Sequence, residues 1–228
     1  DQDNADAPGS YRLTPEELDM LTQVTNHFEQ TIVVLNVSNI VDMSWVKEPS
    51  HKYPIAAVVY AWHGGMEGGN AIADVLSGSV TPSGRLTDTL AYSIEDYPST
   101  SNYGSEFQSV YEDDVYVGYR YFETFHPEKV QYEFGFGLSY TTFDQAPEGA
   151  KTVQKDGAEW IELGVTVTNT GDAFEGKEVV QAYIEAPQGK LGQPVKKLVA
   201  FGKTKLLKPG ESQRIALSFP VDKLASYD

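Results

Sequence analysis

The sequence predicts an α/β fold followed by an all-β fold, and three patterns along its 228 residues support this prediction. Two continuous apolar runs, residues 32–35 and 55–62, alternate with segments of helical periodicity, as in a parallel sheet whose strands are joined by helices. From about Asp144 the pattern changes to a period of two, which is typical of antiparallel strands. Residues 1–150 carry 23 acidic and 6 basic side chains, whereas residues 151–228 carry 10 and 11. We therefore expect a domain boundary near residue 150.

A first helix is expected to begin after Thr14. Thr14 suits the N-cap, Pro15 suits the first helical position, and Glu17 completes a capping box. The apolar residues that follow recur at helical spacing and predict one apolar face: Leu18, Leu21, Val24 and Phe28. A second helix is predicted over residues 67–77, directly after the second apolar run.

The second half of the chain predicts short strands separated by turns. Strands are expected over residues 160–168 and 179–184, and a turn over residues 208–211 should separate strands 203–207 and 214–219. This spacing favours an antiparallel sandwich. The intervening residues 92–131 are rich in aromatic side chains and are predicted to be irregular.

Composition excludes several classes of partner and site. The net charge of −16 leaves no basic patch to neutralise phosphates, which argues against nucleic acid. No apolar run is long enough to span a bilayer, so no membrane partner is expected. The absence of cysteine excludes disulfides and thiolate metal sites and leaves the cellular compartment open. No secretory signal pattern is found at the start, which says nothing about export if the chain is a fragment.

The segment 132–143 combines aromatic residues with two closely spaced glycines. Gly135 and Gly137 are expected to allow a sharp bend or a close approach to another segment. The run of aromatic and β-branched residues after Gly137 predicts a bulged strand that leads into the β domain. We expect this segment to pack the α/β half against the β module rather than to perform chemistry.

Four blocks in register resemble the C-terminal region of glycoside hydrolase family 3, and most closely its β-glucosidase-like members. They are the glycine-rich turn and helix of residues 64–78, and residues 82–86, 117–122 and 132–143. The resemblance runs from near Thr14 to the end of the chain. His63, Met66 and Thr87 depart from the family pattern and put the subfamily in doubt.

The resemblance implies a domain division. Residues 1–98 would form the C-terminal part of an α/β sandwich domain, and residues 99–143 an aromatic-rich linker and connecting strand. Residues 144–228 would form a fibronectin type III-like domain, incomplete at its C-terminus.

The resemblance also implies a function for the longer enzyme. The chain would be the C-terminal polypeptide of a retaining β-glycosidase that acts on terminal, non-reducing β-D-glucosides, without a cofactor or metal. The family's nucleophilic aspartate lies in an N-terminal barrel, and its acid/base glutamate lies in a loop before the helix that starts at Thr14. Neither has a counterpart here, so we expect no catalytic residue in this chain and no activity without a barrel-containing polypeptide. A homo-oligomer stays open.

Three alternatives belong to other classes or specificities. The first is a non-catalytic carbohydrate-binding or scaffolding protein of the same architecture, and the second is a family 3 β-xylosidase. A nucleotide-binding α/β domain is the third, but neither a P-loop nor a dinucleotide fingerprint is found.

The connection after the second apolar run contains the candidate substrate-contact residues Trp62, His63 and Glu67. Ligands of open parallel sheets bind at the carboxyl ends of strands. Trp62 could stack on a sugar ring, and His63 and Glu67 could hydrogen-bond its hydroxyls. The alternative is structural: the glycines around them allow a tight strand-to-helix turn, and Glu67 suits a helix N-terminus.

Other candidate sites have weaker patterns. Residues 1–6 have alternating oxygen ligands but lack the glycine and glutamate of a calcium loop. The sequon at Asn36 directly follows a predicted buried strand, which opposes glycosylation. Adjacent carboxylates are interpreted as solvated charges: Glu16–Glu17, Glu95–Asp96 and Asp113–Asp114. Three histidines lack metal-ligand spacing and are expected at the surface or at caps: His27, His51 and His126.

Overall fold

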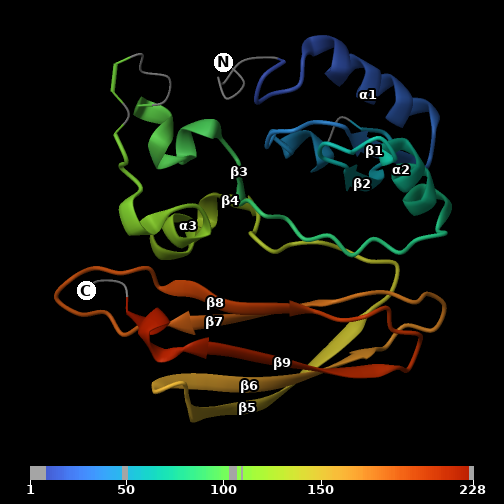
Figure 1. Ribbon diagram of the computed structural model, residues 1–228. Helices are drawn as coiled ribbons and strands as arrows, with labels where there is room; N and C mark the ends of the chain where they lie inside the picture. Colours follow the sequence, from blue (N-terminus) through green and yellow to red (C-terminus); the bar gives the residue numbers. More distant parts are fainter. Residues whose placement is uncertain (1–8, 48–50, 103–106, 109, 226–228) are drawn as a thin grey trace. The chain divides into compact units, whose positions relative to one another are not determined.

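The computed structural model describes residues 9–47, 51–102, 107–108 and 110–225, which form two compact units (Figure 1). The first unit comprises the described residues up to Ala73, together with Thr87–Asp114 and His126–Phe134. The second comprises Asp74–Leu86, Val115–Phe125 and the described residues from Gly135 onward. The chain therefore passes between the units several times before it enters the C-terminal β-structure.

Helix α1 (Pro15–His27) begins at the predicted capping box. The Glu17 amide donates to the Thr14 hydroxyl over 3.2 Å, and the Thr14 amide donates to the Glu17 carboxylate over 2.8 Å. These bonds satisfy amide groups near the helix start. Of the predicted apolar face, Leu21 is buried, but Leu18 and Phe28 are 44% and 61% exposed. The helix is confirmed, and only part of its apolar face is covered.

Strands β1 (Thr31–Leu35) and β2 (Ile55–Tyr60) pair in parallel, as predicted. Within the described part of the chain they form a two-stranded sheet, so each strand keeps one unpaired edge. Leu35 is buried, whereas Ile32 is 52% exposed. Continuous apolar runs of this kind predict strands that are covered on both faces, and the exposure of Ile32 shows that this prediction is wrong for β1.

Helix α2 (Gly68–Ser77) follows β2 and confirms the second predicted helix. None of its residues is buried, although Ile72, Val75 and Leu76 are apolar. A helix of this composition is normally covered by neighbouring elements. Among the described helices, none has both the length and the apolar character needed to cross a bilayer.

Strands β3 (Leu90–Ala91) and β4 (Val130–Tyr132) form a short antiparallel pair in the first unit. Tyr11 is buried, and its hydroxyl donates to the Ala91 carbonyl oxygen over 2.9 Å. The Tyr97 hydroxyl accepts from the Ala91 amide over 2.9 Å, so two tyrosines hold β3 in place. Much of the segment predicted to be irregular forms short 3-10 helices: η2 (Ile94–Asp96), η3 (Pro98–Asn102), η4 (Asp114–Tyr116) and η5 (Pro127–Lys129).

The second unit contains two antiparallel sheets, as predicted (Figure 1). One sheet has the order β5 (Phe143–Lys155), β6 (Ala158–Asn169) and β9 (Ser212–Pro220). The other pairs β7 (Val179–Glu185) with β8 (Lys196–Lys203). Apolar residues that alternate along these strands form one core together with Leu207 from a loop: Val165, Val167, Val180, Leu207, Ile215 and Leu217.

The strand predicted over residues 203–207 is wrong, because β8 ends at Lys203. Leu207 is fully buried and forms an isolated bridge with Gly176, so it fills the core from a loop. The turn that follows is confirmed. Gly210 has φ +77°, and the Glu211 amide donates to the Lys208 carbonyl oxygen over 2.8 Å.

Helix α3 (Tyr119–Phe125) contradicts the prediction that residues 92–131 are irregular throughout. The helix satisfies one backbone donor within β8 and one directly before it. The Leu198 amide donates to the Tyr119 hydroxyl over 2.7 Å, and the Val195 amide donates to the Thr124 hydroxyl over 3.1 Å. Donors at a strand edge would otherwise be open to pairing with another chain.

The segment 132–143 forms a turn rather than the predicted bulged strand. Gly135 has φ +84°, and a Cβ atom there would lie 2.5 Å from the Gln181 side chain. A Cβ atom at Gly137 would lie 2.5 Å from the Gly84 carbonyl oxygen. The predicted bend and close approach are confirmed. Residues 135 and 136 exchange two backbone hydrogen bonds with Leu86, and regular strand structure begins only with β5 at Phe143.

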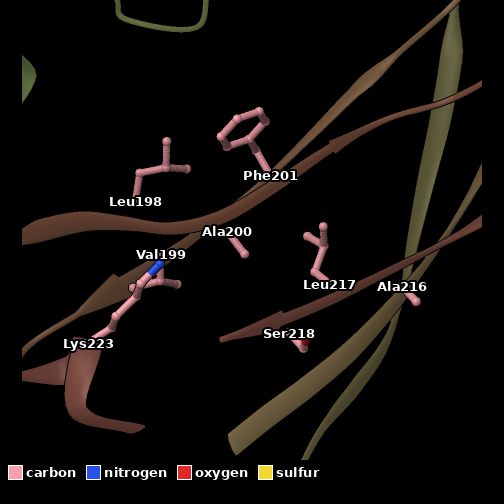
Figure 2. Close-up of a pocket in the computed structure, with 8 residues that line it drawn as sticks. All are labelled: Leu198, Val199, Ala200, Phe201, Ala216, Leu217, Ser218 and Lys223. Atoms are coloured by element: carbon pink, nitrogen blue, oxygen red, sulfur yellow. The ribbon is translucent and has the colours of Figure 1, made fainter. Parts of the chain in front are cut away.

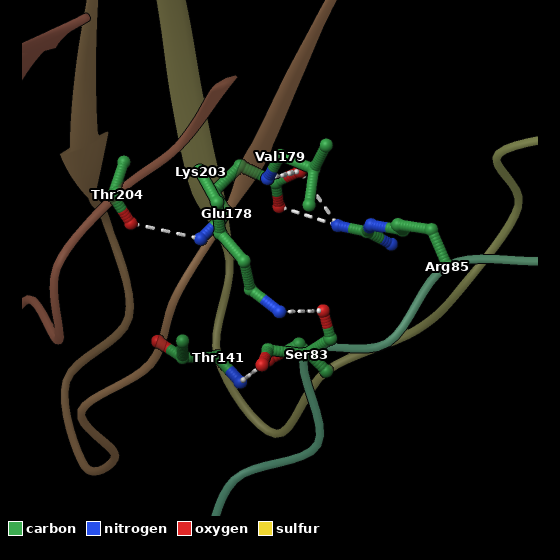
Figure 3. A network of polar contacts seen from close by, with 8 residues as sticks. Ser83, Arg85, Thr141, Glu178, Val179, Lys203 and Thr204 are labelled. Carbon is green, nitrogen blue, oxygen red and sulfur yellow. Dashed lines mark hydrogen bonds and ion pairs between the residues drawn. The ribbon is translucent and has the colours of Figure 1, made fainter. Parts of the chain in front are cut away.

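A polar network joins the segment around Arg85 to β7 and β8 (Figure 3). The Arg85 guanidinium pairs with the buried Glu178 carboxylate over 2.5 Å, and the Val179 amide also donates to that carboxylate over 2.9 Å. The Lys203 ammonium donates to the Ser83 carbonyl oxygen over 2.8 Å. The second unit thus includes residues that precede the β-structure by many positions.

Candidate functional site

The connection between β2 and α2 contains the three residues predicted to contact substrate. β2 ends at Tyr60, so Trp62 and His63 follow its carboxyl end, and Glu67 directly precedes α2. This is the end of a parallel strand at which ligands of open sheets bind. The predicted location of the candidate residues in the fold is therefore confirmed, whereas their role stays a prediction.

Trp62 has an unusual backbone conformation and a defined ring contact. Its φ of +54° lies in the left-handed region that non-glycine residues rarely adopt. Its ring lies 4.4 Å from the Tyr60 ring, with 35° between the ring planes. The Tyr60 hydroxyl donates to the Asn39 carbonyl oxygen over 2.5 Å, and burial raises the pKa of Tyr60 to about 12. Strained backbone conformations of this kind cluster at functional sites.

The rest of the connection is open to solvent. His63 and Glu67 are exposed, and the Glu67 carboxylate accepts a hydrogen bond from the Asn70 side-chain amide over 2.5 Å. A Cβ atom at Gly64 would lie 2.8 Å from the Gly68 Cα atom, so the turn itself requires glycine at position 64. A Cβ atom at Gly65 would have no neighbour within 4 Å. The need for a tight strand-to-helix turn thus explains the glycine at position 64 but not the glycine at position 65.

The adjacent carboxylates have different surroundings. Glu17 closes the cap of α1, and Asp96 pairs with Lys129 over 2.9 Å. One oxygen of Asp113 is buried without a hydrogen-bond partner. Desolvation, and then the charge of Glu112, raise the pKa of Asp113. Neither Glu17 nor Asp96 is therefore a free carboxylate.

One histidine differs from its predicted surface or capping role. His51 is partly buried in the first unit, where its Nδ1 atom is 3.1 Å from the Thr25 hydroxyl and its Nε2 atom is 2.9 Å from the Trp45 carbonyl oxygen. It joins α1 to the segment before β2. Across the described ranges, no group of three or more potential ligands is arranged to hold a metal ion. The predicted calcium-like pattern of residues 1–6 lies outside the described residues.

The sequon asparagine is more accessible than its position suggested. Asn36 directly follows β1 and is exposed, although Leu35 before it is buried. Burial of the strand therefore does not block the Asn36 side chain.

A groove of about 500 Å³ lies between β8 and β9 in the second unit (Figure 2). Its apolar wall includes Leu198 and Phe201 from β8 and Leu217 from β9. Lys223, from the short helix η6 (Val221–Leu224), supplies a charged group. Sequence analysis missed this groove, because its walls come from separate strands. The available local signal was Phe201, which is 70% exposed on a strand.

Comparison with protein families gives two matches along the chain. Residues 1–140 match the glycosyl hydrolase family 3 C-terminal domain. Residues 178–228 match the fibronectin type III-like domain. The two matches follow the order of the α/β and β-rich parts of the fold.

Curated relatives of the chain include two bacterial enzymes. β-Glucosidase A of Butyrivibrio fibrisolvens is 47% identical over 96% of this chain and 28% of its own length. A β-glucosidase of Ruminococcus albus is 45% identical over all of this chain and 23% of its own length. The chain therefore spans about a quarter of the length of these relatives.

Solved structures of β-glucosidases also match the chain over only part of their own length. A β-glucosidase from Paenibacillus barengoltzii has a TM-score of 0.95 and 57% identity, over all of this chain and 24% of its own. β-Glucosidase 3B from Thermotoga neapolitana, solved in complex with glucose, has a TM-score of 0.83 and 38% identity. That match covers 97% of this chain and 31% of the Thermotoga protein.

Proposed function

Because the chain belongs to glycoside hydrolase family 3, we propose that it is the C-terminal polypeptide of an enzyme that hydrolyses terminal, non-reducing β-D-glucosides. In this proposal the chain is inactive alone and acts with an N-terminal, barrel-containing polypeptide of the same enzyme. The reaction retains configuration: one carboxylate forms a covalent glycosyl-enzyme, and a second acts as acid and then as base. Both carboxylates belong to the N-terminal polypeptide.

The main support for this proposal is that the chain matches only a small part of the length of its relatives. β-Glucosidases 45% and 47% identical to the chain align over nearly all of it, yet the alignment covers only 23% and 28% of their own lengths. In the proposal, the barrel and its catalytic residues correspond to the part of the relatives that this chain does not match.

Uncovered apolar surfaces support a further partner. Ile32 is 52% exposed on β1 in the first unit, and α2, whose residues from Asp74 onward belong to the second unit, buries none of its apolar residues. β1 and β2 each keep an unpaired edge in the described sheet. Exposed apolar faces and open edges on a parallel sheet are unfavourable in water, so additional strands and helices would stabilise the first unit.

For the domain organisation we propose the division expected from the sequence. Residues 1–98 would complete an α/β sandwich, residues 99–143 would connect it, and residues 144–228 would form the fibronectin type III-like module. The family matches at residues 1–140 and 178–228 support this order.

Trp62, His63 and Glu67 are proposed to line the rim of the substrate cleft. The Trp62 ring is held against Tyr60 and is partly exposed, which suits stacking on the apolar face of a sugar. His63 and Glu67 are exposed and could bond sugar hydroxyls. These residues would hold the sugar but would take no part in bond cleavage.

An activity assay tests the main proposal. The purified chain should release no nitrophenol from an aryl β-glucoside, whereas its complex with the part of a relative that it does not match, for example of the Butyrivibrio enzyme, should do so. An aryl α-glucoside serves as the negative control. Hydrolysis by the chain alone would overturn the proposal, as would a stable complex that leaves the β-glucoside intact.

Substitution of Trp62 tests the cleft residues in that complex. Trp62→Ala should raise KM about three- to tenfold, because an aromatic contact contributes at this scale. Met66→Ala in the same connection is the matched control, since Met66 is fully exposed. An unchanged KM for a folded Trp62→Ala complex would remove Trp62 from the cleft.

The alternative functions predict different results. A carbohydrate-binding protein should bind glucose or cellobiose as the isolated chain, which calorimetric titration measures directly. A β-xylosidase should prefer the aryl β-xyloside once the complex forms. The exposed apolar surfaces favour a chain that needs a partner polypeptide over an independent binding module.

A further inference from the structure

Three cationic side chains of the second unit lie on elements around the groove between β8 and β9. They are Arg120 on α3, Lys197 on β8 and Lys223 on η6. Lys223 lines the groove (Figure 2). The Lys197 ammonium donates to the carbonyl oxygen of Ala225, the residue after η6, over 2.7 Å. This bond brings β8 and η6 together and holds Lys197 near Lys223.

Arg120 has an incompletely satisfied guanidinium. Its Nε atom is buried without a hydrogen-bond partner, and its Nη1 atom has only a long contact of 3.5 Å to the Val115 carbonyl oxygen. The guanidinium carbon lies 5.9 Å from the centre of the Tyr119 ring. A buried donor on a charged group is costly to leave unpaired. We therefore expect the Arg120 Nε atom to bind an acceptor other than the groups described above.

Among the described residues, none of the three cations belongs to an ion pair. Glu123 on α3 instead pairs with Lys196 over 2.7 Å. Burial, and then the charges of Arg120 and Lys223, lower the pKa of Lys197. In a chain of net charge −16, a cluster of cations without ion pairs among the described residues indicates a site for an anion.

We propose that Arg120, Lys197 and Lys223 bind an oxyanion, a carboxylate or phosphate group, beside the groove between β8 and β9. A guanidinium offers a planar fork of donors to such a group, and two ammonium groups add point charges. Leu198 and Leu217 in the groove would contact an apolar portion attached to the anion. The site does not depend on the proposed glycosidase function, because all its residues lie within the second unit.

Inorganic phosphate is the probe for this site. At constant ionic strength, phosphate should raise the thermal midpoint of the full chain more than chloride does, and should shift the amide resonances of Leu198 and Ala225. In Lys223→Gln the phosphate affinity should fall about tenfold, as for a lost charge-assisted hydrogen bond. Lys190→Gln is the matched control, because it removes the same charge from an exposed loop position.

The sign of the stability change separates an anion site from a structural role. Without multivalent anions, Lys223→Gln should raise the thermal midpoint, because it removes the repulsion between Lys223 and Lys197. In saturating phosphate the same variant should be less stable than the parent chain. A loss of stability that is equal in both buffers would overturn the proposal.

Sedimentation distinguishes the two sources of the oxyanion. If a second copy supplies a carboxylate, the chain should self-associate, and both phosphate and Lys223→Gln should dissociate it. If the ligand is a free anion, the chain should stay monomeric while it binds phosphate. A chain that neither binds phosphate nor self-associates through Lys223 would refute the site.

Discussion

The Arg85 guanidinium binds the Glu178 carboxylate across 93 positions of sequence. The two side chains are 18% and 9% exposed, and the pair belongs to the network that joins residues 83–85 to β7 and β8 (Figure 3). The Val179 amide adds a further bond to the same carboxylate. A charge in this position is stable only while its partner is present.

Arg85→Met should therefore destabilise the chain strongly. The substitution keeps a long apolar stem but leaves the Glu178 carboxylate largely buried and uncompensated, at a cost of about 3 kcal/mol. Urea unfolding followed by circular dichroism measures the change. The double variant Arg85→Met/Glu178→Met should be less destabilised than Arg85→Met alone. Equal or additive losses would mean that the buried charge is not the cause.

Gly137→Ala should destabilise the second unit through a backbone clash. The new Cβ atom would lie 2.5 Å from the Gly84 carbonyl oxygen, which cannot move without disturbing the neighbouring Arg85. Overpacking of this kind costs about 1–3 kcal/mol. Gly189→Ala is the control, since its Cβ atom would meet nothing within 4 Å. Similar unfolding midpoints for the two variants would contradict the close approach.

Asn169 is a fully buried amide at the end of β6, and Asn169→Ala should lower stability by about 3 kcal/mol or more. Its oxygen accepts from the Thr141 hydroxyl and the Gly171 amide, and its nitrogen donates to the carbonyl oxygens of Phe174 and Leu207. The substitution leaves several of these groups unpaired.

Asn169→Asp tests the directions of these bonds. It keeps the size of the side chain but turns a double donor into an acceptor facing two carbonyl oxygens, so it should unfold the chain at least as readily as Asn169→Ala. Thr142→Val is a control at an exposed neighbouring bond, with an expected change below about 1 kcal/mol. Full stability of Asn169→Asp would contradict the assigned network.

Local signals predicted the elements whose causes lie within a few residues. The capping box at Thr14 predicted the start of α1, and the two apolar runs predicted the parallel pair β1–β2. The position of the candidate residue Trp62 was also predictable, because the carboxyl end of a strand can be located from sequence. Its positive φ could not be predicted, since tryptophan gives no local signal for a conformation that non-glycine residues rarely adopt.

Other features depend on contacts distant in sequence. Helix α3 consists largely of aromatic residues without a capping signal, and its Tyr119 and Thr124 bond to segments more than seventy positions away. The segment after Gly137 has the composition of a strand, yet the approach of Gly84 gives it another conformation. The pairing of Arg85 with Glu178 has no local signal at all.

Alkaline pH should unfold the chain through tyrosines whose hydroxyls are shielded from water. Desolvation raises the pKa of the partly buried Tyr60 and of Tyr183 to about 12, and raises that of the buried Tyr11 further, from an ordinary value of 10.0. The folded state therefore favours the neutral phenols. Their contribution to stability should be fully present below pH 10.0 and lost as the pH rises through about 12. Urea midpoints measured across this range should fall steadily with pH.

Tyr60→Phe isolates one of these groups. At neutral pH the variant should be less stable, because the hydrogen bond from the Tyr60 hydroxyl to the Asn39 carbonyl oxygen is lost. Phenylalanine cannot ionise, so the gap between the variant and the parent chain should narrow as the pH rises above 10.0. Tyr111→Phe is the control, because Tyr111 is 90% exposed and its loss should not change the slope. If the gap for Tyr60→Phe stays constant up to the highest pH, ionisation of Tyr60 does not contribute to alkaline unfolding.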